Sequence, residues 1–216
     1  MVSILLLAGC KSQGDQPVSA ASVLASDRPN TTSFTRGSGG SVTTTLGYGI
    51  KVDPNSSLNR EWITAHDSLA PMDFDGTVGV TTVYKTGGEY STGQYNYHAS
   101  VPLVFKQDVA AFEIRFVLFD VWGEFAKTLS YTEVEDNGAG TKKTFTPDWS
   151  VYSENEVSEH YASLAYLARV RTKSGRVFEA NYGPVLLEAR TISARFKPEW
   201  LEPTRLPGRD STRARK

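Results

Sequence analysis

The three histidines and the single cysteine are the side chains of this 216-residue chain best suited to bind a metal or act as nucleophiles. His66, His98 and His160 lie far apart in the sequence, without a paired spacing such as His-x-x-x-His that would direct two ligands to one metal. Cys10, being alone, can form neither an internal disulfide nor a cluster of zinc-binding thiolates. Ser158 does not lie in a Gly-x-Ser-x-Gly nucleophile elbow. We therefore predict no metal site, no cofactor and no acyl-transfer site.

Two acidic clusters are the next candidates for chemistry. Glycoside hydrolysis needs a carboxylate pair held across a cleft, and calcium needs several oxygen ligands around one loop. Neither spacing is recognisable here, so solvated loops are favoured, although the fold could still bring these carboxylates together. The clusters consist of Glu133, Glu135 and Asp136, and of Glu154, Glu156 and Glu159.

The segment from Gly138 to Thr144 has the superficial composition of a phosphate-binding loop. Such loops place a glycine directly before the lysine and continue into a helix whose N-terminus holds the phosphate. Here Thr141 precedes Lys142, and Asp136 and Asn137 come just before the glycines. The segment is therefore predicted to be a turn between two strands.

Four tyrosines lie among glycines and small polar residues between residues 84 and 97. Tyrosine in such surroundings is typical of adaptable binding loops, because it offers a large contact area at little entropic cost. The same composition suits a β-hairpin whose tyrosines pack across the strands, so both interpretations stay open. The candidate binding surface consists of Tyr84, Tyr90, Tyr95 and Tyr97.

The elements that must position these residues are predicted to be strands. Short stretches rich in β-branched and aromatic residues alternate with Gly, Pro, Asn, Asp and Ser, and helical periodicity is scarce. The predicted strands are Glu61 to His66, Thr77 to Lys85, Gln94 to Phe105, Ala111 to Asp120, Phe125 to Val134, Lys142 to Thr146, Ala162 to Thr172, Arg176 to Asn181 and Val185 to Ser193.

Two stretches make a sandwich the most specific prediction. The run Lys173-Ser174-Gly175 between two alternating stretches predicts a hairpin. The strand from Ala111 to Asp120 has one fully apolar face, and its other face carries Val117 and Phe119, which indicates that this face is also partly covered. The apolar face consists of Phe112, Ile114, Phe116 and Leu118, and the other of Glu113, Arg115, Val117 and Phe119.

The run Phe116-Val117-Leu118-Phe119-Asp120 followed by Gly123 resembles the aromatic-x-Leu-aromatic-Asp strand of FxLYD-type domains. The resemblance covers about Val101 to Arg190 and implies an all-β fold, an immunoglobulin-like antiparallel β-sandwich, without catalytic residues common to the family. Since no disulfide can close the core, aromatic residues must do so. Trp149 is the candidate for the central tryptophan, with Trp122 as the alternative.

The apolar run from Val2 to Ala8 ends in Leu7-Ala8-Gly9-Cys10, which resembles the lipobox of bacterial lipoproteins. In that family the cysteine thiol carries diacylglycerol, a signal peptidase cuts just before it, and the new amino terminus is acylated. The resemblance implies lipidation of Cys10 and attachment to the lipid bilayer, because each buried methylene adds about 0.8 kcal/mol of membrane affinity. The alternative is an apolar N-terminal strand with a buried cysteine. Lys11 after the anchor favours the outer membrane if the source is Gram-negative.

These features divide the chain into four parts. Residues 1–9 are the expected signal peptide, and residues 10–45, rich in Ser, Thr and Gly, a flexible, disordered linker. Residues 46–197 are the expected sandwich, and residues 198–216 a disordered basic tail. No apolar run is long enough for a transmembrane helix, and the net charge of -1 gives no indication of nucleic-acid binding.

The sequence therefore predicts a lipid-anchored protein of the bacterial cell envelope that acts as a non-enzymatic binding or assembly module for a protein or glycan partner. The alternative is a carbohydrate-active hydrolase that uses acidic residues brought together by the fold.

Overall fold

The structure is a computed structural model, and it describes residues 30–41, 59–85, 94–150 and 160–203. Several residues singled out above lie outside this part of the chain: Cys10, Tyr90, Ser158, and the second acidic cluster of Glu154, Glu156 and Glu159. In the described ranges, no helix is long and apolar enough to cross a membrane.

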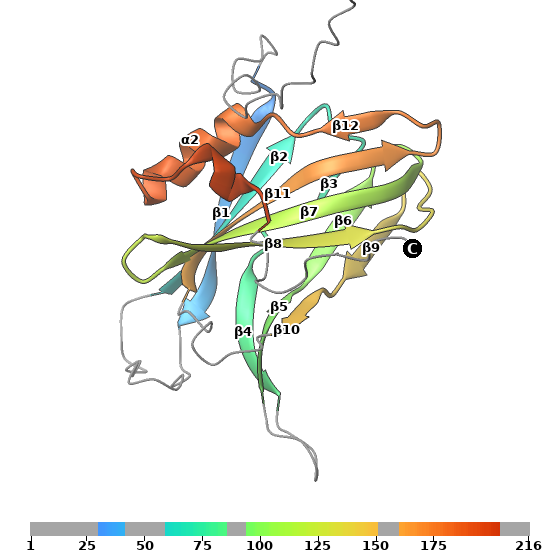
Figure 1. The fold of residues 1–216 in the computed structure, drawn as a ribbon. Coiled ribbons are helices and arrows are strands. Elements are labelled where there is room, and N and C mark those ends of the chain that lie inside the picture. The colour runs from blue at the N-terminus through green and yellow to red at the C-terminus, as the bar shows by residue number, and fades with distance from the viewer. Residues whose placement is uncertain (1–29, 42–58, 86–93, 151–159, 204–216) are drawn as a thin grey trace, which may run out of the picture.

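Strands dominate the described part of the chain, and they pack as sheets against one another, so the predicted all-β sandwich is confirmed (Figure 1). The strands are β1 (Thr32–Ser41), β2 (Asn59–Asp67), β3 (Met72–Phe74), β4 (Val80–Lys85), β5 (Gln94–Ala99), β6 (Val101–Phe105), β7 (Val109–Asp120), β8 (Phe125–Glu133), β9 (Lys142–Phe145), β10 (Asp148–Ser150), β11 (His160–Thr172) and β12 (Val177–Glu179). The helices are α2 (Tyr182–Ile192) and the 3-10 helix η2 (Pro198–Leu201).

The main sheet has the strand order β1-β2-β11-β7-β8, with β12 paired to β11. The predicted hairpin at Lys173-Ser174-Gly175 joins β11 to β12 and is confirmed, with Gly175 at a φ of 88°. The pair β2 and β11 is parallel, which differs from the wholly antiparallel arrangement expected, whereas the other pairs of this sheet are antiparallel.

The second layer consists of two three-stranded sheets, β10-β5-β4 and β3-β6-β9. Their central strands β5 and β6 follow one another with only Ser100 between them, so the single strand predicted from Gln94 to Phe105 is interrupted there. Each sheet therefore continues into the other through one long central segment of chain.

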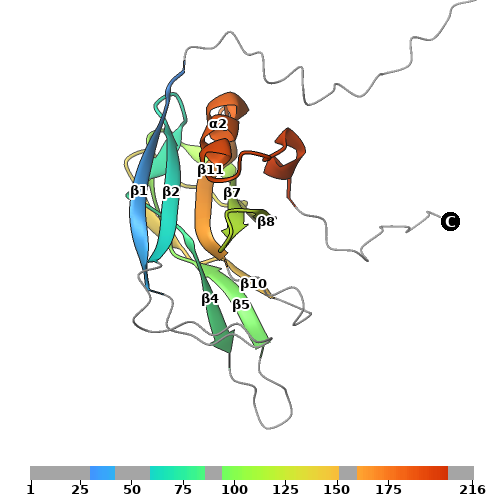
Figure 2. The same cartoon turned by 90° about the vertical axis from the view of Figure 1, so that its left-hand side faces the viewer.

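The core lies on both faces of β7, as its sequence predicted. On the inner face Phe112, Ile114, Phe116 and Leu118 are buried against the second layer. On the outer face Val117 and Phe119 are buried together with residues of α2. Figure 2 shows α2 and η2 on this outer side of the main sheet.

The helix α2 occupies residues that were predicted as the strand Val185 to Ser193, so that prediction is wrong. The side chain of Asn181 caps the helix by accepting a hydrogen bond from the Gly183 backbone N at 3.2 Å. Val185 and Ala189 then lie one turn apart and face the sheet. The apolar run therefore packs as a helical stripe, because its cap starts a helix directly before it.

Both predicted ends of the sandwich also need correction. Strand β1 lies inside the segment expected to be a linker, because pairing with β2 supplies backbone hydrogen bonds and Phe34 packs against the outer core. Arg36 adds ion pairs with Glu61 of β2 and Glu188 of α2. At the other end, η2 lies in the predicted tail, with Leu201 buried. Residues 204–216 lie outside the described ranges.

The two tryptophans proposed for the core have opposite environments. Trp149 packs edge-on against Phe116 at a centroid distance of 5.5 Å, and its Nε1 donates to the Ser130 carbonyl at 2.8 Å. It therefore contributes to the inner core, as predicted. Trp122 lies in the turn between β7 and β8 and is 83% exposed, so it is not a core residue.

Candidate functional site

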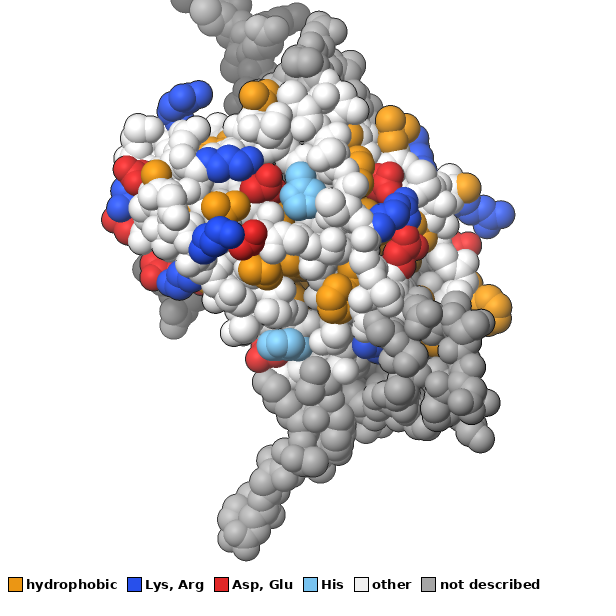
Figure 3. All heavy atoms as spheres, turned by 180° about the vertical axis from the view of Figure 1, so that it is seen from behind, with side chains coloured by type: hydrophobic (Ala, Val, Ile, Leu, Met, Phe, Trp, Pro, Cys, Tyr) orange, Lys and Arg blue, Asp and Glu red, His pale blue; other side chains and the backbone are white. Residues whose placement is uncertain are grey.

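The first polar cluster joins β1, β2 and β3 through His66. The Nδ1 atom of His66 lies 2.9 Å from Asp73 Oδ1, and its Nε2 atom lies 2.9 Å from Thr35 Oγ1. Lys106 Nζ also donates to Asp73 Oδ2, at 3.1 Å. Figure 3 shows acidic, basic and histidine side chains close to one another on the face of the molecule opposite to that of Figure 1.

The order carboxylate, imidazole, hydroxyl is that of a hydrolase triad, which makes this cluster worth testing against that chemistry. The Thr35 hydroxyl lies in the middle of a paired strand and accepts a further hydrogen bond from Thr77 Oγ1 at 3.2 Å. Burial would raise the pKa of Asp73, but hydrogen bonds from His66 and Lys106 hold it below its ordinary value. The carboxylate is therefore ionised, and the bonds join three strands.

The other two histidines lie apart from His66. His98 Nδ1 lies 2.9 Å from Asp148 Oδ1, which links β5 to β10. His160 is buried, and its Nε2 lies 2.7 Å from the Val80 carbonyl. Burial lowers the pKa of His160 to about 4, so its ring is neutral near pH 7. Over the described ranges, no three His, Cys, Asp or Glu side chains are placed to share a metal ion.

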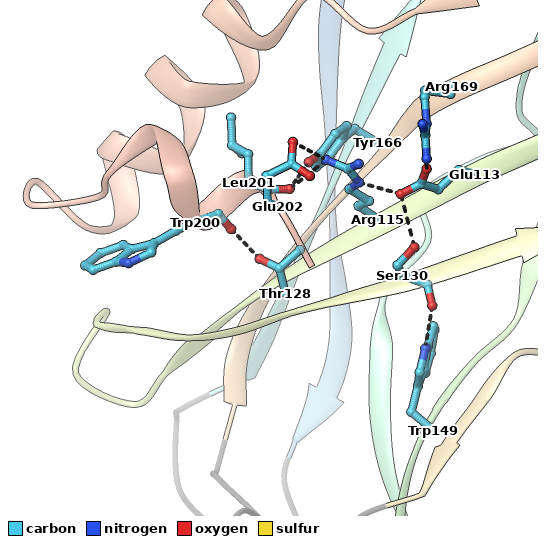
Figure 4. A network of polar contacts seen from close by, with 10 residues as sticks. All are labelled: Glu113, Arg115, Thr128, Ser130, Trp149, Tyr166, Arg169, Trp200, Leu201 and Glu202. Carbon is cyan, nitrogen blue, oxygen red and sulfur yellow. Dashed lines mark hydrogen bonds and ion pairs between the residues drawn. The ribbon is translucent and has the colours of Figure 1, made fainter. Parts of the chain in front are cut away.

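A second polar cluster surrounds Glu113, on the outer face of β7 (Figure 4). The Glu113 side chain is buried and accepts hydrogen bonds from Arg115 Nε at 2.6 Å, Arg169 Nε at 2.8 Å and Ser130 Oγ at 3.2 Å. Burial would raise the pKa of Glu113, but the two arginines lower it. The carboxylate is therefore ionised and fully engaged with its neighbours.

The same network continues to the C-terminal segment that covers this face of the sheet. Arg115 Nη1 donates to the Leu201 carbonyl at 3.2 Å and lies 3.1 Å from Glu202 Oε1. The Tyr166 hydroxyl donates to the same carbonyl at 2.6 Å. Figure 4 shows these groups converging on the chain just after η2. The cluster therefore holds η2 on the main sheet.

The sequence contained a signal for this cluster that was not used. Glu113 and Arg115 occupy the face of β7 that carries Val117 and Phe119, and Arg169 of the neighbouring strand β11 lies opposite Glu113. Opposite charges on a covered sheet face indicate an ion pair. However, the sequence does not reveal how β11 pairs with β7, and it is this pairing that places Arg169 beside Glu113.

The candidate tyrosine surface is not supported at Tyr97, which is 1% exposed. Its ring meets that of His160 edge-on at 5.6 Å, and Lys127 Nζ lies 5.2 Å from the ring centroid. Tyr97 is therefore a core residue. Tyr84 and Tyr95 pair with one another across β4 and β5, and their side chains, like Tyr90, lie outside what the structure describes.

The glycine-containing segment before Lys142 forms a turn that leads into β9, as predicted. Gly140 has a φ of 81°, and its backbone N donates to the Phe105 carbonyl at 2.7 Å. In the neighbouring acidic cluster, Glu135 pairs with Lys143 Nζ at 2.5 Å, and the hydroxyl of Tyr131 donates to Glu133.

A shallow hollow, partly open to solvent, lies where the start of α2 meets β1, β2 and β11. Two of its polar side chains already bind nearby parts of the chain. Asp67 accepts hydrogen bonds from Thr31 Oγ1 and the Leu69 backbone N, and Asn181 caps α2. The lining consists of Thr32, Ala65, Asp67, Tyr166, Leu167, Ala180, Asn181 and Val185.

The turn between β7 and β8 presents the most exposed large apolar side chain of the described residues, Trp122. Asp120 Oδ1 accepts hydrogen bonds from the backbone N atoms of Trp122 and Glu124, each at 2.9 Å. Gly123 follows in the left-handed region, with a φ of 74°. The turn is therefore well ordered, and it holds an indole ring away from the core.

Comparisons with known proteins find solved structures of low similarity. No family model matches, and neither does any curated protein. An X-ray structure of a hypothetical protein from Peptoclostridium difficile 630 is similar with a TM-score of 0.41 and 7% identity, over 57% of this chain and 92% of that one. A Northeast Structural Genomics Consortium target is similar with a TM-score of 0.31 and 14% identity, over 51% of this chain and 80% of that one.

Proposed function

We propose that this chain is a lipid-anchored module of the bacterial cell envelope that binds, or helps to assemble, a protein or glycan partner. The observation that carries the proposal is the run Leu7-Ala8-Gly9-Cys10, whose cysteine is the only one in the chain. Two or more acyl chains on that residue hold a protein at a membrane stably. The β-sandwich then follows the anchor within a short length of chain, since β1 begins at Thr32.

The arrangement of polar residues supports binding rather than catalysis as the role. Asp73 with His66, and Glu113 with its two arginines, form bonds that join strands or hold η2. The exposed indole of Trp122 is instead the kind of side chain that dominates recognition surfaces, where tryptophan is enriched.

Membrane fractionation of a bacterial host tests the anchor. We expect the wild-type chain to sediment with membranes in high salt and to be released by detergent, whereas Cys10→Ser stays in the soluble fraction. High salt matters because it removes proteins held by charge alone. A wild-type chain that distributes as Cys10→Ser does would contradict the proposal.

Capture of a partner from detergent-solubilised membranes tests binding. We expect the wild-type domain to retain a specific protein or a glycan, in an amount that exceeds the retention by a matrix without the domain. A wild-type domain that retains nothing, under conditions in which known complexes survive, would count against a binding role.

A further inference from the structure

The turn between β7 and β8 combines an exposed indole with an ordered backbone. Trp122 is 83% exposed, and its neighbour Val121 is 37% exposed. In contrast, Trp149 and Trp200 pack on aromatic rings of the core, at centroid distances of 5.5 Å from Phe116 and 4.6 Å from Phe125. Exposing so large an apolar surface costs free energy that burying it elsewhere would recover.

Hydrogen bonds of Asp120 and a close approach to α2 fix this turn. Asp120 accepts the two backbone hydrogen bonds described above, and its own backbone N donates to the Glu124 carbonyl at 2.9 Å. Gly123 lies against the end of α2, because a Cβ atom there would be 3.1 Å from the Ile192 carbonyl oxygen. Figure 1 shows the hairpin loop projecting beside the end of α2. The turn therefore loses little conformational entropy when Trp122 enters a contact.

The charges around the turn nearly cancel. Arg190, Arg195 and Lys197 are exposed at and after the end of α2, and Glu124 and Glu199 are exposed on neighbouring segments. A contact through this turn must therefore depend on the indole more than on net charge. The interfacial region of a bilayer suits such a group, since tryptophan is enriched at the headgroup level of membranes.

From these observations we infer that the turn of residues 120–124 is a second membrane contact, in which Trp122 enters the interfacial region of the bilayer that holds the lipid anchor. The inference rests on the proposed anchoring at Cys10. Only the nineteen residues 11–29 separate Cys10 from the first described residue, and a chain of that length spans at most about 65 Å, which keeps the domain near the lipid surface. Tethering raises the effective concentration, so one weakly inserting side chain is sufficient.

The single cysteine allows a direct test on the chain from Cys10 onward. Coupling Cys10 to a maleimide lipid in phosphatidylcholine vesicles supplies the anchor chemically, and brominated acyl chains quench any tryptophan that reaches the bilayer. We expect quenching of up to about one quarter of the emission, since Trp122 is one of four tryptophans. Trp122→Ala removes this quenching, whereas Trp149→Phe, which alters a core tryptophan, keeps it.

A second variant tests the turn itself. Asp120→Ala keeps Trp122 but removes the hydrogen bonds that order the backbone, so quenching falls below the wild-type value even though the indole is present. Equal quenching in wild type and Trp122→Ala overturns the inference, and so does a coupled wild-type chain without quenching. Retention of a captured protein that depends on Trp122, without quenching on vesicles, also overturns it in favour of a protein contact.

The result of the quenching experiment does not depend on whether cells lipidate Cys10, because chemical coupling supplies the anchor on the vesicles. Failed quenching with normal lipidation in cells refutes the membrane contact alone. Quenching on vesicles with an unmodified Cys10 in cells refutes the proposed anchor alone.

Discussion

Glu113 is the residue whose substitution tests the buried cluster most sharply. Glu113→Gln keeps the shape of the side chain but leaves Arg115 with a weakened partner in a buried site. We expect a loss of about 3 kcal/mol in the free energy of unfolding, because breaking a buried ion pair leaves a charge uncompensated. Urea unfolding followed by circular dichroism measures this.

The matched control is Glu135→Gln, which breaks the exposed pair with Lys143. Exposed pairs contribute less than about 1 kcal/mol. Equal losses in the two variants would contradict the role assigned to the Glu113 cluster.

His160 makes the free energy of unfolding depend on pH. Its pKa is lowered to about 4 in the fold by burial, whereas an unfolded histidine has a pKa of about 6.5. Between these values only the unfolded chain binds the proton, so stability is complete above about pH 6.5 and falls as the pH drops toward 4. The slope from this residue is at most about 1.4 kcal/mol per pH unit.

Unfolding by urea at several pH values checks this expectation. His160→Gln, which keeps an N–H group for the Val80 carbonyl, should flatten the curve between pH 6.5 and 4. Asp73 and Glu113 affect stability at lower pH than His160 does. Their pKa values are lowered in the fold, so the stability that they contribute is lost only as the pH falls through these lowered values. A His160→Gln curve parallel to wild type would contradict the burial of a neutral ring.

At the residue scale, the sequence left the positions of two aromatic residues open. Tyr97 suited either a binding surface or packing across strands, and Trp122 was the alternative to Trp149 for the core. In the structure Tyr97 is buried and Trp122 is exposed. Alternation along a strand shows that two faces exist but not which face is covered. Asp120 and Gly123 could have marked Trp122 as a turn residue, because both side-chain types favour turns.

At the element scale, the indole of Trp62 in β2 leaves no room for a side chain at Gly79, which directly precedes β4. The indole of Trp62 lies against Gly79, where a Cβ atom would be only 2.1 Å from Trp62 Cδ1. We therefore expect Gly79→Ala to lower the free energy of unfolding by about 1–3 kcal/mol, as overpacking does.

Thermal unfolding compares this variant with Gly138→Ala. At Gly138 the nearest atom to an added Cβ would be 3.7 Å away, so little change is expected. A Gly79→Ala protein as stable as the Gly138→Ala protein would show that Trp62 can move aside at no cost.

Strands were predictable where apolar residues alternate, as in β7, β8 and β11. The helix α2 was missed because its run from Val185 to Leu187 resembles a buried strand, and a short apolar run cannot distinguish the two by itself. Asn181, two residues before Gly183-Pro184, was the available signal for a helix start. Strand β1 had no comparable signal, because its order comes from pairing with β2.

At the scale of the whole molecule, the sandwich could be predicted but its limits could not. Residues 32–41 have a composition typical of a linker, and residues 198–201 directly precede the basic tail. Tertiary contacts order both segments. The C-terminal segment is held by the Leu201 carbonyl, which binds Arg115 and Tyr166. Such contacts join residues far apart in the chain, so local sequence contains no trace of them.

Mass spectrometry of the mature amino terminus shows whether Cys10 carries the lipid anchor. The full chain is expressed in a bacterium with lipoprotein processing, beside Cys10→Ser. We predict a terminus at Cys10 that carries a diacylglyceryl group and an amide-linked acyl chain, and a Cys10→Ser chain that lacks both. An unmodified chain that still begins at Met1 would contradict lipid anchoring through Cys10.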